Sequence, residues 1–481
     1  VLPAESLYAI EHDTMDTTFR SMYQGLYIYL SARKERRDLL LSQRPPRFDE
    51  SLDSMISRSE DDFTRIALKA KAAQDYFLLI GPPGTGKTSC ALKKMVETFH
   101  ADKDAQILLL SYTNRAVDEI CKSLASIAPA VDFIRVGSEL SCDEAYRGHL
   151  IENELSSCNR RSEVYERIRN CRIIVGTVAA ISGKPELFRL KHFDVAIIDE
   201  ATQILEPQLL GILCARGEDG KDAIDKFVLI GDHKQLPAVV QQNTEQSAIY
   251  DESLLSIGLT NLKDSLFERL YRNCTATVHR SYDMLCRQGR MHPEVALFAN
   301  RAFYGGRLIP VGLPHQIESS DTICRLAFYP SVPEKAGASA KINYSEARIV
   351  ADLAARIYED HQTDFDESRT LGIITPYRSQ IALIKKEIES LGIPALNRIL
   401  VDTVERFQGS ERDVIIYSFC VNYPYQLKFL SNLTEEEGVL IDRKLNVALT
   451  RARKQMFITG VPELLERNPL YKSLLKLIES F

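Results

Sequence analysis

A glycine-rich segment at residues 81–88 carries the residue types needed to bind phosphate. It reads Gly-Pro-Pro-Gly-Thr-Gly-Lys-Thr and follows the apolar run 76–80. In the pattern GxxxxGK[S/T], glycines turn backbone N–H groups toward phosphate oxygens, the lysine reaches the β- and γ-phosphates, and the last hydroxyl is a magnesium ligand. The sequence therefore predicts a nucleotide site formed by Gly81, Pro82, Pro83, Gly84, Thr85, Gly86, Lys87 and Thr88.

An acidic pair, Asp199 and Glu200, ends the apolar run 195–198. At the carboxyl end of a buried parallel strand, such a pair faces the crevice in which α/β proteins bind nucleotides. We expect Asp199 to hold magnesium and Glu200 to activate the water that attacks the γ-phosphate. Alone, the pair would be interpreted as a solvated loop after a strand. Beside a phosphate-binding segment, the catalytic interpretation is favoured.

Three further polar residues are candidates for contact with the γ-phosphate. Gln235 lies in the segment 231–237, directly after the apolar run 227–230. A glutamine there can sense hydrolysis, because its partner leaves with the phosphate. Arg290 and Arg451 lie much further along the chain. Arginines from a neighbouring element stabilise the charge of phosphoryl transfer, so we expect these two to link hydrolysis to closure of two domains.

Short apolar runs alternate with helical stretches from about residue 60 onward. Continuous apolar runs are typical of parallel strands covered by helices on both faces, so the predicted fold class is α/β. The pattern restarts near residue 280. We expect a helical N-terminal arm at 1–60, one domain at 61–280 and a second at 281–481, with 316–341 the most loop-like stretch. The predicted strands are 76–80, 107–110, 172–175, 195–198, 227–230, 371–374, 413–416 and 456–459.

The N-terminal arm combines a helical pattern with a basic run. Phe19, Met22 and Leu26 recur at helical spacing, residues 33–37 continue that helix, and the prolines within 44–47 end it. Two interpretations of the basic residues remain open. They form either a solvated helix face or an arm that contacts the phosphates of a nucleic acid. The arm is also the part of the chain in which we expect contacts with protein partners.

Composition excludes several classes of protein. The chain has 481 residues, 45% hydrophobic and 26% charged, with a net charge of -6, so it is neither fibrous nor wholly disordered and shows no overall basic footprint. No apolar run approaches the ~18 residues needed to cross a membrane. Ten cysteines without a CxxC pair favour an intracellular location, in a bacterial cytoplasm or a eukaryotic nucleus or cytoplasm. The first residue is Val, as expected of a fragment or a processed chain.

Eight segments together resemble the motifs of superfamily 1 helicases of the Upf-like branch, which includes the nonsense-decay RNA helicase and the replication nuclease-helicases. The resemblance runs from about residue 60 to 462 and keeps the family's motif order. In that order the segments are GPPGTGKT (81–88), SYTNRAVD (111–118), GTVAAIS (176–182), DEATQ (199–203), GDHKQLP (231–237), QGRMHP (288–293), VDTVERFQGSERDVII (401–416) and LNVALTRAR (445–453).

This resemblance implies two RecA-like P-loop NTPase domains in tandem, with ATP and magnesium in the cleft between them. It also implies a single strand of nucleic acid across both domains and 5′-to-3′ movement. We expect the protein to be monomeric. Whether the strand is DNA or RNA remains open, because the family contacts the phosphate and sugar that both nucleic acids have. The motif V residues Gln408 and Glu411 would link strand to nucleotide. The strand would be contacted by Thr113, Asn114, Thr177, Thr375, Pro376, Tyr377, Thr403 and Gln408.

The sequence departs from the family pattern at four places. A glutamine expected about 18 residues before the P-loop would fall at Phe63, and a tyrosine expected after Gln288 is Gly289. In relatives these two residues read and stack on the nucleobase, so we expect weak base selectivity. Motif III ends in Ala238 where a second proline is common, and an extra acidic stretch at 434–438 separates motifs V and VI.

Two functional hypotheses remain open from the sequence. The first is an ATP-driven translocase that unwinds nucleic acid. The second is a strand-stimulated ATPase that acts as a clamp or remodels protein with little unwinding. A P-loop GTPase is disfavoured because no NKxD segment is present. An AAA+ unfoldase is disfavoured because both candidate arginine fingers belong to the same chain as the P-loop.

Overall fold

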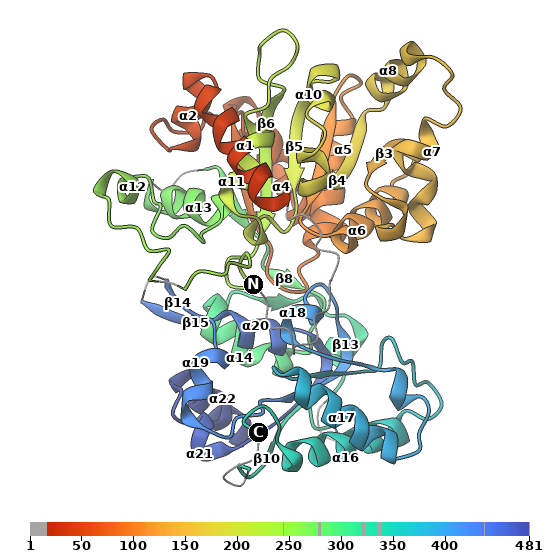
Figure 1. The fold of residues 1–481 in the computed structure, drawn as a ribbon, viewed down its shortest axis with the longest axis vertical. Coiled ribbons are helices and arrows are strands. Elements are labelled where there is room, and N and C mark those ends of the chain that lie inside the picture. Colours follow the sequence, from red (N-terminus) through yellow and green to blue (C-terminus); the bar gives the residue numbers. More distant parts are fainter. Residues whose placement is uncertain are drawn as a thin grey trace, which may run out of the picture.

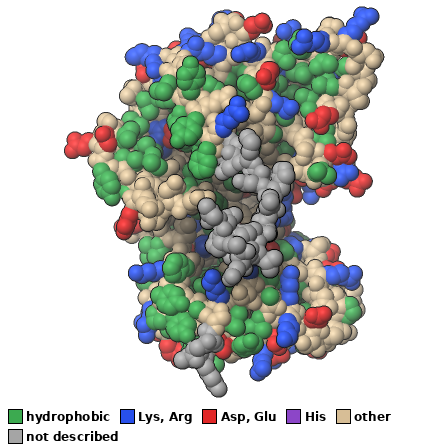
Figure 2. Space-filling view, in the orientation of Figure 1, with side chains coloured by type: hydrophobic (Ala, Val, Ile, Leu, Met, Phe, Trp, Pro, Cys, Tyr) green, Lys and Arg blue, Asp and Glu red, His purple; other side chains and the backbone are tan. Residues whose placement is uncertain are grey.

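The structure is a computed structural model that describes residues 17–480 except 244, 278–279, 320–322, 335–338 and 437. Two lobes lie one above the other, each built on its own sheet (Figure 1). The outline narrows where the lobes meet, and basic side chains lie interspersed with acidic ones on the face shown in Figure 2. Among the described residues, no helix has the length and apolar character needed to span a membrane.

The first lobe is built on a seven-stranded sheet in the order β3-β4-β2-β5-β6-β1-β7, with every pairing parallel. Alternate residues of one strand enter different cores: Leu78 packs in one cluster and Leu79 in another. A strand that is buried on both faces must be continuously apolar, and this is why the apolar runs of the sequence correspond to strands in the structure. The strands are β1 (Tyr76–Ile80), β2 (Ile107–Ser111), β3 (Phe133–Val136), β4 (Ile173–Thr177), β5 (Phe193–Ile198), β6 (Ile224–Gly231) and β7 (Tyr282–Met284).

Helices cover both faces of this first sheet (Figure 1). They are α1 (Thr17–Ser31), α2 (Lys34–Leu40), α3 (Asp53–Arg58), α4 (Asp62–Ala72), α5 (Lys93–His100), α6 (Asn114–Ala125), α7 (Ile151–Glu154), α8 (Arg161–Asn170), α9 (Val178–Ser182), α10 (Glu186–Leu190), α11 (Glu206–Leu213), α12 (Glu252–Ser256) and α13 (Leu266–Thr277). The edge strands β3 and β7 were not predicted. Since β7 pairs with β1, the first sheet extends beyond residue 280.

The second lobe contains a five-stranded parallel sheet in the order β10-β16-β13-β11-β12. Its strands are β10 (Leu326–Pro330), β11 (Leu371–Ile374), β12 (Leu400–Asp402), β13 (Arg412–Ser418) and β16 (Ala452–Gly460). Two small sheets complete the structure: β8 (Arg287–Gln288) pairs with β9 (Ile309–Pro310), and β14 (Leu433–Glu436) pairs antiparallel with β15 (Val439–Asp442). The prediction of a loop at 316–341 was wrong at β10, a short edge strand.

The helices of the second lobe are α14 (Pro293–Tyr304), α15 (Pro314–Ile317), α16 (Tyr344–Asp360), α17 (Arg378–Ser390), α18 (Val404–Phe407), α19 (Leu427–Leu430), α20 (Arg443–Leu449), α21 (Pro462–Leu465) and α22 (Pro469–Glu479). The prediction of one continuous helix through residues 19–37 was wrong, because Arg33 has an extended backbone (φ -61°, ψ 142°) that separates α1 from α2.

The arm is docked on the first lobe. Helix α1 packs against α11, and a Cβ added to Gly25 would lie 2.4 Å from the carbonyl oxygen of Pro207. Glycine at this position lets the two helix backbones approach closely. In α2, the side chains of Leu39 and Leu40 enter one core of the first lobe. The described part of the arm therefore shares its core with the lobe.

The sheet order places three loops side by side at the carboxyl ends of β1, β6 and β5. Gly231 at the end of β6 pairs with Ile80 of β1, and Ile198 at the end of β5 pairs with Leu229 of β6. The P-loop, the segment 231–237 and the acidic pair leave the sheet from these neighbouring ends. Three segments far apart in sequence thus meet at one edge, where parallel α/β sheets bind ligands.

Candidate nucleotide site between the lobes

The P-loop directly contacts the second lobe. Gly84 and Gly86 both have φ of +74°, a left-handed conformation that favours glycine. A Cβ on Gly84 would lie 2.4 Å from Cβ of Arg290, and the N–H of Gly289 donates to the carbonyl of Gly84 at 2.8 Å. Any side chain at Gly84 would therefore separate the lobes at the point where they touch the P-loop.

The acidic pair makes direct contact with the P-loop. The Thr88 hydroxyl donates to Oδ2 of Asp199, and Nζ of Lys87 lies 2.7 Å from Oε1 of Glu200. Gln203 donates from Nε2 to Oε2 of Glu200 at 2.8 Å. The backbone of Glu200 is left-handed, with φ of 54°. For a residue other than glycine this costs on the order of 1–3 kcal/mol, and such strain is concentrated at functional sites.

The electrostatics of this group fit a bound cation and a bound phosphate. Burial and the charge of Glu200 raise the pKa of Asp199 to about 6. Burial opposes the charged form of Lys87, but the carboxylates of Glu200, Asp199 and Asp232 together outweigh burial and raise the pKa of the ammonium. A hydroxyl and a carboxylate in contact are the oxygen ligands that magnesium prefers. The residues present at Thr88 and Asp199 therefore fit the ion that the sequence predicted.

Gln235 lies between the lobes with both ends of its amide engaged. Its Nε2 donates to Oδ2 of Asp232 at 2.7 Å, and its Oε1 accepts from Nη2 of Arg451 at 3.2 Å. Arg451 is only 2% exposed, and burial together with the charge of Arg290 lowers its pKa to about 9. A guanidinium held this way is stabilised by an added anion, as expected of an arginine that meets phosphate.

Arg290 is held at the mouth of the same cleft. Its Nε donates to Oε2 of Glu411 at 2.5 Å, and its Nη1 donates to the carbonyl of Thr450 at 3.3 Å. The predicted catalytic residues of both lobes line one cavity of about 960 Å³, within the size range of small-molecule sites. They are Lys87, Thr88, Asp199, Glu200, Gln235, Arg290 and Arg451, with Glu411 and Gln408 beside them.

The residues expected to contact a strand lie mainly at carboxyl ends of strands. Thr113 and Thr177, after β2 and at the end of β4, accept the N–H groups of Ala116 and Ala180 and so cap α6 and α9. Segment 375–377 follows β11, and Thr403 follows β12. The Thr375 side chain is fully buried, so its hydroxyl does not face solvent. Contact with a strand by Thr113, Asn114, Thr177, Thr375, Pro376, Tyr377, Thr403 and Gln408 stays a prediction.

Three residues of the cleft were given no role from the sequence. Phe63 lines the cavity at the position where the family has its glutamine, Gln203 holds Glu200, and Arg453 lies 3.7 Å from Glu411. Gln203 and Arg453 belong to motif segments, so their position was a usable signal. The lining role of Phe63 depends on how α4 packs against the P-loop, which no local pattern indicates.

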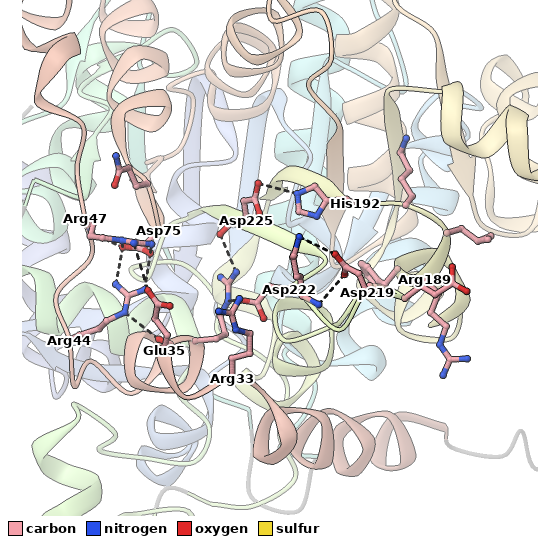
Figure 3. A pocket seen from close by; sticks show the side chains of 18 residues that line it. Arg33, Glu35, Arg44, Arg47, Asp75, Arg189, His192, Asp219, Asp222 and Asp225 are labelled. Carbon is pink, nitrogen blue, oxygen red and sulfur yellow. Dashed lines mark hydrogen bonds and ion pairs between the residues drawn. The ribbon is translucent and has the colours of Figure 1, made fainter.

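Three arginines of the arm bind the amino-terminal end of the first sheet, and two of them, Arg44 and Arg47, are seen at Asp75 in Figure 3. Arg44 donates two hydrogen bonds to the Asp75 carboxylate, at 2.8 and 2.9 Å, and Arg47 donates to the same group. Arg36 is buried and donates to the carbonyls of Ile224 and Asp225. Arg36 is buried, so for this residue both open interpretations were wrong. Arg44 and Arg47 also fasten the arm to the lobe, but the Arg47 side chain stays 59% exposed.

Comparison with known proteins gives matches along most of the chain. Two family models, both described as AAA domain, match residues 58–164 with 151–243, and 262–463. The DNA replication ATP-dependent helicase/nuclease JHS1 of Arabidopsis thaliana is 29% identical over 99% of this chain and 35% of that protein. The human DNA replication ATP-dependent helicase/nuclease DNA2 is 28% identical over 98% of this chain and 45% of that protein.

A shorter relative and a set of viral structures also match. The DNA polymerase alpha-associated DNA helicase A of Saccharomyces cerevisiae is 24% identical over 95% of this chain and 73% of that protein. A solved arterivirus helicase, nonstructural protein 10 with DNA, has a TM-score of 0.42 and 14% identity over 86% of this chain and 65% of the other. The chain thus spans less than half the length of the nuclease-helicases that it matches.

Proposed function

The chain belongs to the superfamily 1 helicases of the Upf-like branch, and from this membership we propose that it is an ATP-driven motor that moves along single-stranded DNA and separates strands. One observation carries the proposal. Lys87, Thr88 and Glu200 of the first lobe and Arg290 and Arg451 of the second line a single cleft. A nucleotide there would be held by both lobes, so its hydrolysis would change how they are held together.

Each residue of the cleft has a defined task in this proposal. The P-loop amides and Lys87 hold the β- and γ-phosphates, and Glu200 accepts the proton of the attacking water. Gln235, Arg290 and Arg451 contact the γ-phosphate and lose that contact when it leaves. Thr88 and Asp199 would hold magnesium, which supplies charge neutralisation at the phosphates when bound. Closure orders these groups, and release of phosphate allows the lobes to separate.

Two details of the proposal, DNA as the strand and the direction of movement along it, have narrower support. The relatives are named as a DNA replication helicase/nuclease and a DNA helicase, which favours DNA as the strand. Membership of the Upf-like branch favours movement from 5′ to 3′. The candidate strand contacts at the ends of β2, β4, β11 and β12 would hold the backbone, so affinity should depend on salt and little on base sequence.

ATPase assays with and without single-stranded DNA, together with strand displacement from 5′- and 3′-tailed duplexes, test this proposal. We expect the strand to stimulate hydrolysis, with log affinity falling linearly with log salt concentration. Displacement should require the 5′ tail. Hydrolysis indifferent to any polynucleotide would reject the motor, and strong stimulation without displacement of either duplex would favour the clamp.

A further inference from the structure

The segment Asp232–Gln235 is held by the second lobe at each of its four residues. Besides the bond from Gln235 to Arg451, Asp232 accepts from the Tyr304 hydroxyl at 2.7 Å, and the carbonyl of Lys234 accepts from Nδ2 of Asn446 at 2.7 Å. Nε2 of His233 lies 3.0 Å from Oε2 of Glu436. This segment contains the predicted γ-phosphate sensor, so its position depends on the lobe that must close.

Glu436 belongs to the acidic stretch that separates motifs V and VI. The stretch folds into the hairpin β14–β15, which lies at the left edge of Figure 1 beside the junction of the lobes. The hairpin leads directly into α20, whose first residue, Arg443, pairs with Glu268 of α13 at 2.5 Å. Both of those side chains are less than 10% exposed. Glu436 and the first residue of α20 thus both contact the first lobe.

The contact at Glu436 joins a buried ring to a partly exposed carboxylate. His233 is 2% exposed and lies against Tyr271 of α13, with ring centroids 4.7 Å apart. Burial acts to raise the pKa of Glu436, but His233, Lys234 and Arg443 together outweigh it, and the pKa falls below its ordinary value. The pair exists only while the lobes are together, so whatever it contributes favours the closed form.

We propose that the hairpin β14–β15 is a latch for domain closure, in which Glu436 is a positioning residue that holds His233 and thereby keeps Gln235 against Arg451. The inference rests on the proposed ATPase. Closure would then depend on three contributions: the nucleotide, the strand and the latch. Since the strand and the latch favour the same closed state, loss of the latch can be offset by more strand, as linkage requires.

The variants Glu436→Gln and Glu435→Gln make a matched pair for the test. Both change one carboxylate to an amide in β14, but Glu435 is exposed on the opposite face of the strand. For Glu436→Gln we expect the strand-free kcat to fall about fivefold or more, because allosteric couplings are typically of that size. The strand concentration for half-maximal stimulation should rise by a similar factor. At saturating strand the loss should shrink, and Glu435→Gln should match the unmodified protein throughout.

Other outcomes overturn the latch. If Glu436→Gln and Glu435→Gln behave alike, the latch is rejected. It is also rejected if Glu436→Gln loses the same fraction of kcat with and without strand while the strand concentration for half-maximal stimulation stays unchanged, because that result would indicate an effect on chemistry. The double variant Glu436→Gln, His233→Asn should lose no more than the worse single variant if the two residues act as a pair. An unmodified protein without strand stimulation would reject the proposed function instead. The latch would then be judged by the double variant alone, in which additive losses of strand-free kcat would overturn it.

Discussion

The ammonium of Lys87 lies 2.7 Å from the carboxylate of Glu200, so the residue expected to bind phosphate is paired with the residue expected to activate water. A triphosphate in the cleft must replace Glu200 as the partner of Lys87. The same exchange leaves the carboxylate of Glu200 free to accept a proton. Binding of the substrate and preparation of the base are therefore one event in this site.

Substitution of either partner separates the two roles. Lys87→Ala should weaken ATP binding by about 10- to 100-fold, because a charge-assisted contact of ~1.5–3 kcal/mol is lost. Glu200→Gln should bind ATP at least as tightly as the unmodified protein, since Lys87 is released, but should lose about 10²- to 10⁴-fold in turnover. Titration with a fluorescent ATP analogue and single-turnover hydrolysis measure the two effects. Turnover at the unmodified rate in Glu200→Gln would show that another residue activates water.

Because its arginines fasten the arm to the first lobe, we expect substitutions at these contacts to change the stability of the fold and not the affinity for DNA. The Asp75 carboxylate is 4% exposed, and although burial acts to raise its pKa, the bonds from Arg44 and Arg47 hold that pKa well below its ordinary value. Asp75→Asn should lower the free energy of unfolding by about 3–5 kcal/mol at pH 7. The depressed pKa means that this stabilisation is present above about pH 4 and is lost as the pH falls further. Urea unfolding at pH 7 and pH 3 measures it.

A surface pair provides the control for that measurement. Lys34 and Asp38 also form an ion pair on the arm, but the Lys34 side chain is 83% exposed. Asp38→Asn should change the free energy of unfolding by less than about 1 kcal/mol at either pH. Equal effects of Asp75→Asn and Asp38→Asn would show that the arm is not fastened through Asp75.

The catalytic half of the site was predictable because its signals are local. A buried parallel strand must be apolar, and the segment after it lies at the edge where ligands bind. The sequence could therefore place Lys87, Asp199 and Gln235 at one edge, although the role of Asp199 was inferred only beside the P-loop pattern. The pairing of Lys87 with Glu200 and the contact between His233 and Glu436 join segments far apart in sequence. Such contacts depend on how the lobes pack, and no spacing in the sequence indicates them.

The contacts of Glu346, in the first turn of α16, also could not be predicted from the local sequence. Residues 343–346 (Asn-Tyr-Ser-Glu) have the sequence form of a capping box, and half of it is present: Asn343 accepts the N–H of Glu346 at 2.8 Å. The Glu346 side chain does not complete the capping box. It is fully buried and accepts from the Ser418 hydroxyl at 2.6 Å and the N–H of Cys420 at 2.8 Å. Burial raises its pKa to about 7 despite these bonds. Tertiary packing of α16 on β13 decided its partners.

Because the pKa of Glu346 is raised, we expect the free energy of unfolding to decrease as the pH rises. Between the ordinary value of 4.5 and about 7 the folded state binds more protons than the unfolded state, so the free energy of unfolding decreases as the pH rises through that window. Relative to Glu346→Gln, the unmodified protein should lose about 3 kcal/mol from pH 4.5 to 7.5. Denaturant unfolding across that range tests this, with Glu389→Gln on the exposed face of α17 as control. A constant difference would exclude titration of Glu346.

The cavity lining includes apolar side chains near the two positions where the family has its base-contacting residues, in addition to the acidic residues Glu60, Asp61 and Asp62. Phe63 lies near the position at which the family has its glutamine, and Leu285 and Val311 also line the cavity. A Cβ on Gly289 would lie 3.2 Å from Leu313 and 3.4 Å from Val311, so these side chains fill space beside the missing tyrosine. Apolar contacts accept any base, because strong rejection of a wrong base requires polar groups that it would leave unpaired.

We therefore expect GTP, CTP and UTP to be hydrolysed within about tenfold of ATP, a difference of ~1.4 kcal/mol in kcat/KM. The P-loop, through Lys87 and Thr88, would supply most of the affinity, and the triphosphate is common to all four substrates. Phe63→Ala should weaken the binding of all four nucleotides to a similar extent. The loss of binding free energy should be on the order of 1–3 kcal/mol if the ring stacks on the base. The measurement is kcat/KM for the four triphosphates with saturating single-stranded DNA, for the unmodified protein and the variant. A thousandfold preference for ATP that disappears in Phe63→Ala would show that the ring reads adenine, and one that survives would place a base reader elsewhere in the cleft.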